Sequence, residues 1–144
     1  MKNMAKETIL KKLEQLAKLL DELKNWLVKN PDFNRDLPLL RASERNFELI
    51  IEQATDINAL ILGELKKPIP DTYLGSFVDL YKAEVIEKEL VDKLQGTAKL
   101  RNQMVHEYDF NEDFKKFYSD LGAQIPVLEE YQKVISAYSQ KLTD

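Results

Sequence analysis

The chain has no cysteine, a single histidine, only four glycines and no long apolar run. Without cysteine, disulfides and thiolate metal sites are excluded, and one histidine cannot supply the usual ligands of a zinc site. The apolar runs are far shorter than the roughly 18 residues that a membrane span needs. The opening residues, MKNMAKETIL, lack the apolar core of a signal peptide. We therefore expect a cytoplasmic protein that does not enter a membrane.

Excess positive charge and phosphate-binding loops are missing as well. The net charge is −4, which argues against nonspecific coating of nucleic acid but leaves room for a local basic site. Neither a GxxxxGK[ST] nor a GxGxxG loop occurs. The serines lack a glycine-rich elbow or a second histidine, so a hydrolase triad is not expected. We expect no bound metal and no cofactor.

What the sequence does contain is helical periodicity. Its 144 residues, 44% hydrophobic and 32% charged, suit one domain, residues 1–144, with a real core. In the first segment, leucine and isoleucine recur in steps of three and four, which predicts an amphipathic helix. This seam consists of Ile9, Leu13, Leu16, Leu20, Leu23 and Leu27. The stretch NPDFN at 30–34 should end the helix, because the residue before a proline avoids helical geometry.

A second helix is predicted from about Asp36, its N-cap, to Gly63, its C-cap, with Pro38 in the first turn. Its apolar arc is wide, which favours a central helix that touches several neighbours. The arc is formed by Phe47, Ile50, Ile51, Ala54, Ile57 and Ile61, and it is widened by Leu49 and Leu60. Asp56 falls at the edge of this arc. Either it is hydrogen-bonded to a neighbouring helix, or it supports a functional site from behind.

The remaining elements follow a proline-rich connector, KKPIPD, at 66–71. We predict a short helix from Asp71 or Thr72, a helix over 84–107, and a last helix over 111–142, capped by Asn111 and kinked at Pro126. The fold class is thus all-α, an antiparallel bundle of four long helices and one short helix.

The stretch LRNQMVHEYDF, at 100–110, carries the chemistry. At about 100° per residue, Arg101 shares a stripe with apolar side chains, where an unpaired guanidinium is costly. It needs an anion, a helix end or a wet crevice such as a subunit interface. On an ideal helix His106 lies about 140° from Arg101. The two converge only if Arg101 reaches sideways, if the helix loosens, or if a second copy contributes one of them.

A histidine and an arginine suffice for metal-free RNA cleavage. Histidine exchanges a proton near neutrality, and arginine offers forked donors to phosphate oxygens. Asn102, one turn before His106, could orient the histidine or a phosphate. The alternative is a surface histidine beside an arginine that is paired with a buried carboxylate such as Asp56. A cluster of aromatic residues nearby suits either base stacking or, more often at this spacing, the core. It comprises Phe110, Phe114, Phe117 and Tyr118.

The same stretch resembles the signature of HepT-like HEPN-domain proteins, in which an arginine and a polar residue are followed by three more positions, a histidine, any residue and a tyrosine. RASERNFELIIEQATDINALIL is similar to the second helix of that family, and PDTYLGSF is similar to its connector and short helix. The resemblance covers most of residues 35–110. One departure is AKLRN, where many relatives carry Gly-Phe before the arginine.

The resemblance implies a homodimer that pairs through the motif helix and forms one composite cleft. It implies a metal-independent endoribonuclease toxin, in a type VII-like toxin–antitoxin system with a minimal nucleotidyltransferase as antitoxin. Arg101 and His106 would be catalytic on an RNA substrate, with Asn102 in support. Tyr108 would be the AMPylation target, and a phosphate there, seven residues from Arg101, would occupy its guanidinium. The alternatives are a non-catalytic nucleotide-binding or assembly subunit and a bare helical oligomerisation module.

Overall fold

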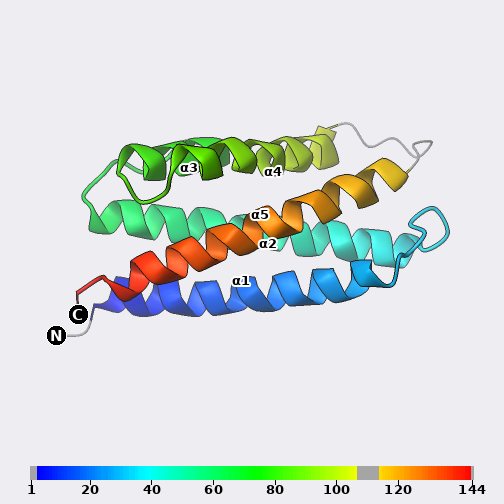
Figure 1. Ribbon diagram of the computed structural model, residues 1–144, viewed down its shortest axis with the longest axis horizontal. Coiled ribbons are helices and arrows are strands. Elements are labelled where there is room, and N and C mark those ends of the chain that lie inside the picture. Colours follow the sequence, from blue (N-terminus) through cyan, green and yellow to red (C-terminus); the bar gives the residue numbers. More distant parts are fainter. Residues whose placement is uncertain (1–2, 107–113, 144) are drawn as a thin grey trace.

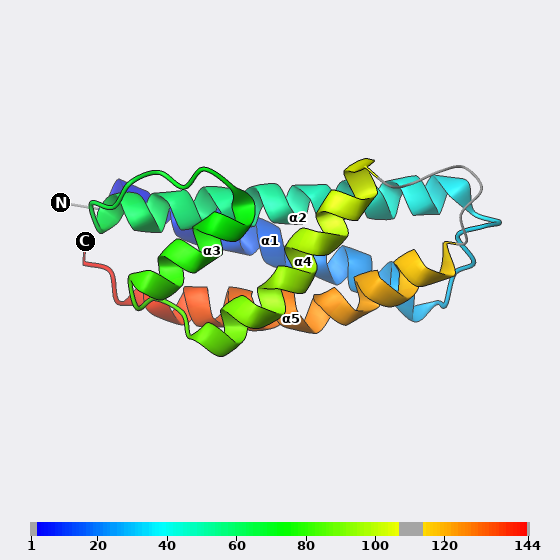
Figure 2. The same ribbon diagram turned by 90° about the horizontal axis from the view of Figure 1, so that it is seen from above.

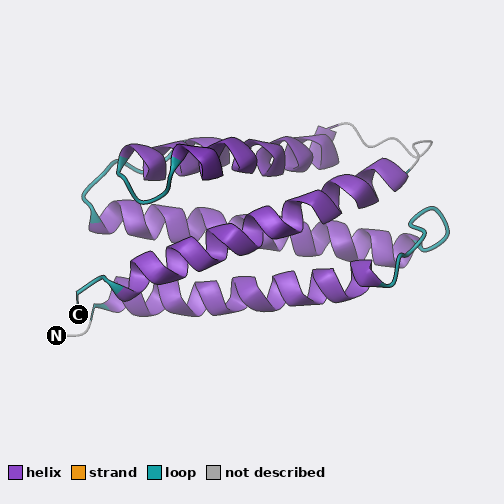
Figure 3. Ribbon diagram, viewed as in Figure 1, coloured by secondary structure: helices purple, strands orange, loops and turns teal. Residues whose placement is uncertain are grey.

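The computed structural model describes residues 3–106 and 114–143, and this part of the chain forms five helices and no strand (Figure 3). The helices are α1 (Met4–Val28), α2 (Leu37–Glu64), α3 (Tyr73–Lys82), α4 (Lys88–His106) and α5 (Lys115–Gln140). The predicted all-α bundle of four long helices and one short helix is thereby confirmed. None of the described helices is both long enough and apolar enough to cross a membrane.

The bundle is elongated, with α1 along one side and α3 and α4 along the other (Figure 1). α1 packs against α2 and α5, and α3 and α4 cover the opposite side of these two helices. Seen from above, the first turn of α3 lies beside the second half of α4 (Figure 2). This arrangement brings two segments that are far apart in the sequence to one face of the molecule.

The core consists of the apolar stripes that the sequence predicts. All six residues of the α1 seam are buried, and so is the predicted apolar arc of α2 apart from Leu49 and Leu60, which are partly buried. Burying each such side chain contributes about 1.5–3 kcal/mol relative to exposure. α2 contacts α1, α3 and α4, which confirms its central position.

Side chains cap the starts of three helices, α1 through Asn3, α2 and α3. The carboxylate of Asp36 accepts a hydrogen bond of 3.1 Å from the backbone N–H of Leu39, which confirms the predicted start of α2. The hydroxyl of Thr72 accepts a hydrogen bond of 3.0 Å from the backbone N–H of Gly75 at the start of α3. Asn111, the predicted cap of the last helix, lies outside the described residues.

The helix ends differ from the prediction at Gly63. α2 continues past it to Glu64, and the left-handed residue is Lys66, with φ 57°. Lys67 then donates its backbone N–H to the carbonyl of Leu62, which satisfies a terminal acceptor without any glycine. Glu84, with φ 63°, ends α3 in the same way. α4 consequently begins at Lys88 rather than at the predicted residue 84.

The aromatic residues at the start of α5 belong to the core. Phe114 and Phe117 are 7% and 2% exposed. The ring of Phe33, from the α1–α2 connection, lies 5.8 Å from that of Phe117 and 6.0 Å from that of Tyr118. The core interpretation is confirmed for Phe114, Phe117 and Tyr118, and Phe110 lies outside the described residues. Pro126 lies inside α5, and the kink expected there stays a prediction.

Candidate functional site around Arg101

Arg101 lies on α4 between buried neighbours. Thr97, one turn earlier, is fully buried, and Met104, one turn later, is 8% exposed. The Thr97 hydroxyl donates a hydrogen bond of 2.7 Å to Oε1 of Gln124, which fixes this face of α4 against α5. Arg101 itself is partly buried, as its place on the apolar stripe predicts.

The guanidinium of Arg101 rests on an aromatic ring. Its Cζ lies 5.1 Å from the ring centroid of Tyr73, the first residue of α3. A cation over the face of an aromatic ring within about 6 Å is attracted by the ring quadrupole. The sequence does not predict Tyr73 as a site residue. It lies 28 residues before Arg101, and no local pattern indicates that the two side chains meet.

Carboxylates of α2 lie close to this pair but are engaged elsewhere. Nη1 of Arg45 lies 3.2 Å from Oε2 of Glu48 and 3.7 Å from Oε1 of Glu52. In the described part of the chain, no ion pair engages Arg101. Its positive charge is therefore available to an anion from outside.

Asp56 does not pair with Arg101, so the ion pair expected in that alternative is wrong, while the surface position of His106 stays a prediction. Its carboxylate lies 3.3 Å from Nζ of Lys12 on α1, and its side chain is 58% exposed. The hydrogen bond to a neighbouring helix confirms one of the two interpretations of Asp56. The residue is not buried, because the edge of the α2 arc faces solvent beside α1.

Two clefts share Arg101 and Tyr73 in their linings. The larger, which we term the amide cleft, has a volume of about 840 Å³. It is lined by Thr72, Tyr73, Leu74, Gln95, Ala98, Lys99, Arg101, Asn102 and Gln103. The smaller, termed the acidic cleft, has a volume of about 320 Å³ and is lined by Glu48, Ile51, Glu52, Thr55, Asp56, Tyr73 and Arg101. A phosphodiester is repelled by the three carboxylates of the acidic cleft, so the amide cleft is the side suited to RNA.

The environment of Tyr73 keeps its hydroxyl neutral. Burial raises the pKa of Tyr73 to about 12, the charge of Arg101 opposes that rise, and Glu48 and Glu52 add to it. The hydroxyl has no hydrogen-bond partner among the described residues. The contact with Arg101 is therefore made by the ring of a neutral phenol.

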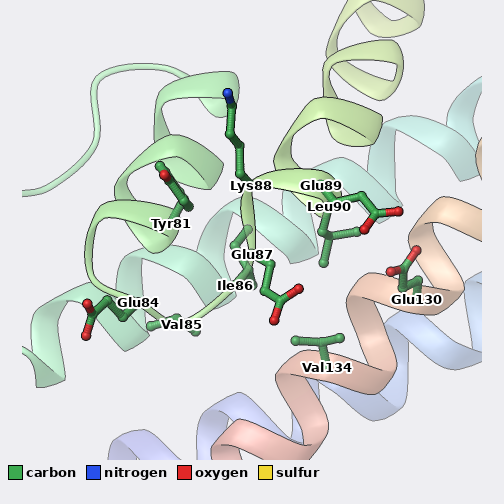
Figure 4. Close-up of a pocket in the computed structure, with 10 residues that line it drawn as sticks. All are labelled: Tyr81, Glu84, Val85, Ile86, Glu87, Lys88, Glu89, Leu90, Glu130 and Val134. Carbon is green, nitrogen blue, oxygen red and sulfur yellow. The ribbon is translucent and has the colours of Figure 1, made fainter.

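A further cleft, with a volume of about 560 Å³, lies where α3 passes into α4 and faces α5 (Figure 4). Glu84, Glu87, Glu89 and Glu130 line it, together with a single lysine, Lys88. Figure 4 shows the side chains of Glu89 and Glu130 next to each other, and Nζ of Lys93 lies 3.8 and 3.2 Å from their carboxylates. This excess of negative charge makes the cleft unsuited to a phosphate backbone.

Comparison with known families assigns the chain. A family model described as Ribonuclease HepT-like matches residues 7–135. The chain belongs to the HepT-like ribonuclease family. A tRNA nuclease HepT from Aphanizomenon flos-aquae is 33% identical over 99 residues, which are 68% of this chain and 67% of that protein.

Solved structures share the fold of this HepT-like chain. A crystal structure of the MntA–HpeT toxin–antitoxin has a TM-score of 0.78 at 23% identity, over 91% of this chain and 98% of that chain. A tri-AMPylated HEPN toxin from Shewanella oneidensis, in complex with an MNT antitoxin, has a TM-score of 0.78 at 23% identity, over 90% and 97% of the two chains. A toxin–antitoxin structure with AMP-PNP has a TM-score of 0.76 at 21% identity, over the same shares.

The structure of this HepT-like ribonuclease brings together two of the four predicted site residues. Arg101 and Asn102 both line the amide cleft, Arg101 partly buried and Asn102 exposed. His106 is the last residue of α4, and its side chain lies outside the described part of the chain. Tyr108 also lies outside it. The convergence of Arg101 and His106 therefore stays a prediction.

Proposed function

We propose that this chain is the toxin of a type VII-like toxin–antitoxin pair, a metal-independent endoribonuclease that works in the cytoplasm. The observation that carries the proposal is the state of Arg101. A guanidinium that is partly buried, lies over the ring of Tyr73 and is free of ion pairs among the described residues is suited to meet a phosphate that arrives from the amide cleft. Membership of the HepT-like family and the likeness to a named tRNA nuclease support this reaction class.

In the proposed reaction, His106 moves the proton and Arg101 stabilises charge. His106 assists attack by the ribose 2′-hydroxyl or protonates the leaving oxygen. Arg101 stabilises the negative charge that develops on the phosphorane-like transition state. Asn102, which shares the amide cleft with Arg101, orients the histidine or a phosphate oxygen.

The active form is proposed to be a homodimer that pairs through α4. Within one helix, Arg101 and His106 diverge by about 140°. Two copies that face each other along α4 bring two arginines and two histidines to one composite cleft. Size-exclusion chromatography with light scattering tests this state, and a monomer that retains activity contradicts it.

The proposed partner is a minimal nucleotidyltransferase antitoxin that AMPylates Tyr108. Its support is the fold shared with the Shewanella oneidensis toxin, which is tri-AMPylated and bound to an MNT antitoxin. An AMP phosphate at position 108 would add negative charge beside the RNA-binding arginine and compete with substrate.

Expression without the partner tests the proposal. We expect slowed growth and degraded RNA from the wild-type chain, and neither from Arg101→Ala or His106→Ala. Arg35→Ala is a matched control, because its side chain lies in the α1–α2 connection, is 89% exposed and lines neither of the two clefts at Arg101. It should behave as the wild type. Normal growth and intact RNA with well-folded wild-type protein would instead favour a non-catalytic nucleotide-binding or assembly subunit.

A further inference from the structure

The contact between Tyr73 and Arg101 joins two helices at the wall of the amide cleft. Tyr73 is the first residue of α3, and Arg101 lies in the second half of α4. Both side chains line the amide cleft and the acidic cleft. Whatever holds this guanidinium in place decides which of the two clefts its donors serve.

We propose that Tyr73 is a positioning residue, whose ring holds the guanidinium of Arg101 at the amide cleft, ready for an RNA phosphate. The proposal rests on the function proposed above and adds to it a residue outside the signature motif. The Cζ atom of Arg101 lies over the face of the Tyr73 ring, so the attraction is to the ring quadrupole and not to a hydrogen-bond acceptor. This contact therefore restricts the position of the guanidinium without pairing its positive charge with an anion.

Tyr73 is itself held by a chain of hydrogen bonds that starts in the core. The Ser76 hydroxyl donates a bond of 2.7 Å to the carbonyl of Tyr73 and accepts one of 2.8 Å from Nδ2 of Asn58 on α2. Tyr131 of α5, which is fully buried, donates to Oδ1 of the same asparagine. The first turn of α3 is thus tied to α2 and α5, which makes Tyr73 a fixed support rather than a loose surface ring.

No carboxylate draws Arg101 away from this support. Arg45 occupies Glu48 and Glu52 on α2, and Lys12 occupies Asp56. An ion pair with any of them would turn the guanidinium into the acidic cleft. Because these carboxylates are paired with other cations, the Tyr73 ring is the contact that orients Arg101 among the described residues.

The ring, and not the hydroxyl, carries this role. The Tyr73 hydroxyl has no hydrogen-bond partner among the described residues, so its removal breaks no described bond. Tyr73→Phe keeps the aromatic ring, whereas Tyr73→Leu replaces it with an apolar side chain that has no ring. The two substitutions therefore separate the ring contact from any role of the hydroxyl.

Cleavage kinetics on RNA form the first test. We expect Tyr73→Phe to retain wild-type kcat within about twofold, and Tyr73→Leu to lose about tenfold in kcat with little change in KM, because Arg101 acts on charge in the transition state. Tyr81→Leu is the matched control, since Tyr81 lies on the same helix, is 42% exposed and should leave both constants unchanged. A wild-type kcat for Tyr73→Leu, or an equal loss in Tyr73→Phe, overturns the proposal.

A second test needs no nuclease activity, so it separates a failure of this proposal from a failure of the proposed function. In a ¹H–¹⁵N spectrum of arginine side chains, the ring current of Tyr73 should displace the Nε–Hε signal of Arg101, which is assigned by its loss in Arg101→Lys. The displacement should persist in Tyr73→Phe and vanish in Tyr73→Leu. If the wild-type chain does not cleave RNA, the nuclease assignment falls, and this signal alone decides on Tyr73. If Tyr73→Leu does not fold, an undisplaced signal in the wild type overturns the proposal and a displaced one supports it.

Discussion

The hydroxyl of Tyr131 on α5 donates a hydrogen bond to Oδ1 of Asn58 on α2, across the centre of the bundle. The same hydroxyl lies 3.2 Å from the carbonyl oxygen of Ala54, and the Tyr131 ring meets that of Phe77 edge to face at 5.5 Å. One buried side chain thus joins α5, α2 and α3, the three elements that set the position of Tyr73.

Tyr131→Phe should destabilise the protein by about 1–3 kcal/mol. The substitution keeps the ring but leaves the buried Oδ1 of Asn58 without its donor. Urea unfolding followed by circular dichroism measures the change. Tyr81→Phe is the control, because its hydroxyl lies on a residue that is 42% exposed, and its effect should stay within about 0.5 kcal/mol. Equal effects of the two substitutions would contradict the network.

Alkaline pH should weaken the fold through Tyr73. Burial raises the pKa of Tyr73 from 10.0 to about 12, so the folded chain holds this proton more tightly than the unfolded chain does. The resulting stabilisation is complete below pH 10 and is lost as the pH rises toward 12. Between these two pH values, urea unfolding should therefore show a smaller decrease in the free energy of unfolding for Tyr73→Phe than for the wild type. Equal decreases in the two proteins would mean that Tyr73 is not shielded from solvent.

Gly122→Ala should stabilise the protein by about 0.5–1 kcal/mol, since glycine inside a helix is unfavourable relative to alanine. A Cβ at Gly122 meets nothing within 4 Å. Gly96→Ala is the contrasting variant, because its Cβ would lie 2.8 Å from Nε2 of Gln124, whose Oε1 accepts the hydrogen bond from Thr97. Thermal unfolding should give Gly122→Ala a higher melting temperature than the wild type, and Gly96→Ala a lower melting temperature than Gly122→Ala. The reverse order would show that Gln124 gives way freely.

The sequence predicts the helices well because burial has a period. The seam of α1 and the arc of α2 are read from steps of three and four residues, and all their members are buried except Leu49 and Leu60, which are partly buried. The helix ends are predicted less well. In the described part of the chain, Asn30, Lys66 and Glu84 adopt the left-handed conformation in which glycine is the usual residue after a helix. Lys66 and Glu84 have no local preference for that geometry, so the sequence does not mark these helix ends.

The candidate site is predicted only where it lies within one helix. The place of Arg101 on an apolar stripe follows from helical geometry, and the structure agrees. Its contact with Tyr73 depends on how α3 packs against α4, which is a tertiary relationship that no local pattern encodes. The engagement of Asp56 by Lys12 is hidden from the sequence for the same reason.

Co-expression with the proposed antitoxin should raise the mass of the chain by one or more AMP units and silence its nuclease activity. AMP attached to the Tyr108 hydroxyl would bring a phosphate to a position seven residues from Arg101, on the same predicted stripe. That charge would compete with RNA for the guanidinium. Tyr108→Phe, which has no hydroxyl to modify, should keep its unmodified mass and stay toxic in the presence of the partner.

Intact-mass spectrometry of both proteins reads out this prediction directly. Tyr81→Phe is the control, since it removes the hydroxyl of a different tyrosine, one that is exposed on α3, and should still gain the AMP increment. An increment that persists in Tyr108→Phe would place the modification on another side chain. Silencing would then have to act through that residue or through steric cover of the amide cleft, and a partner without transferase activity would distinguish the two, because only steric cover survives the loss of AMP transfer.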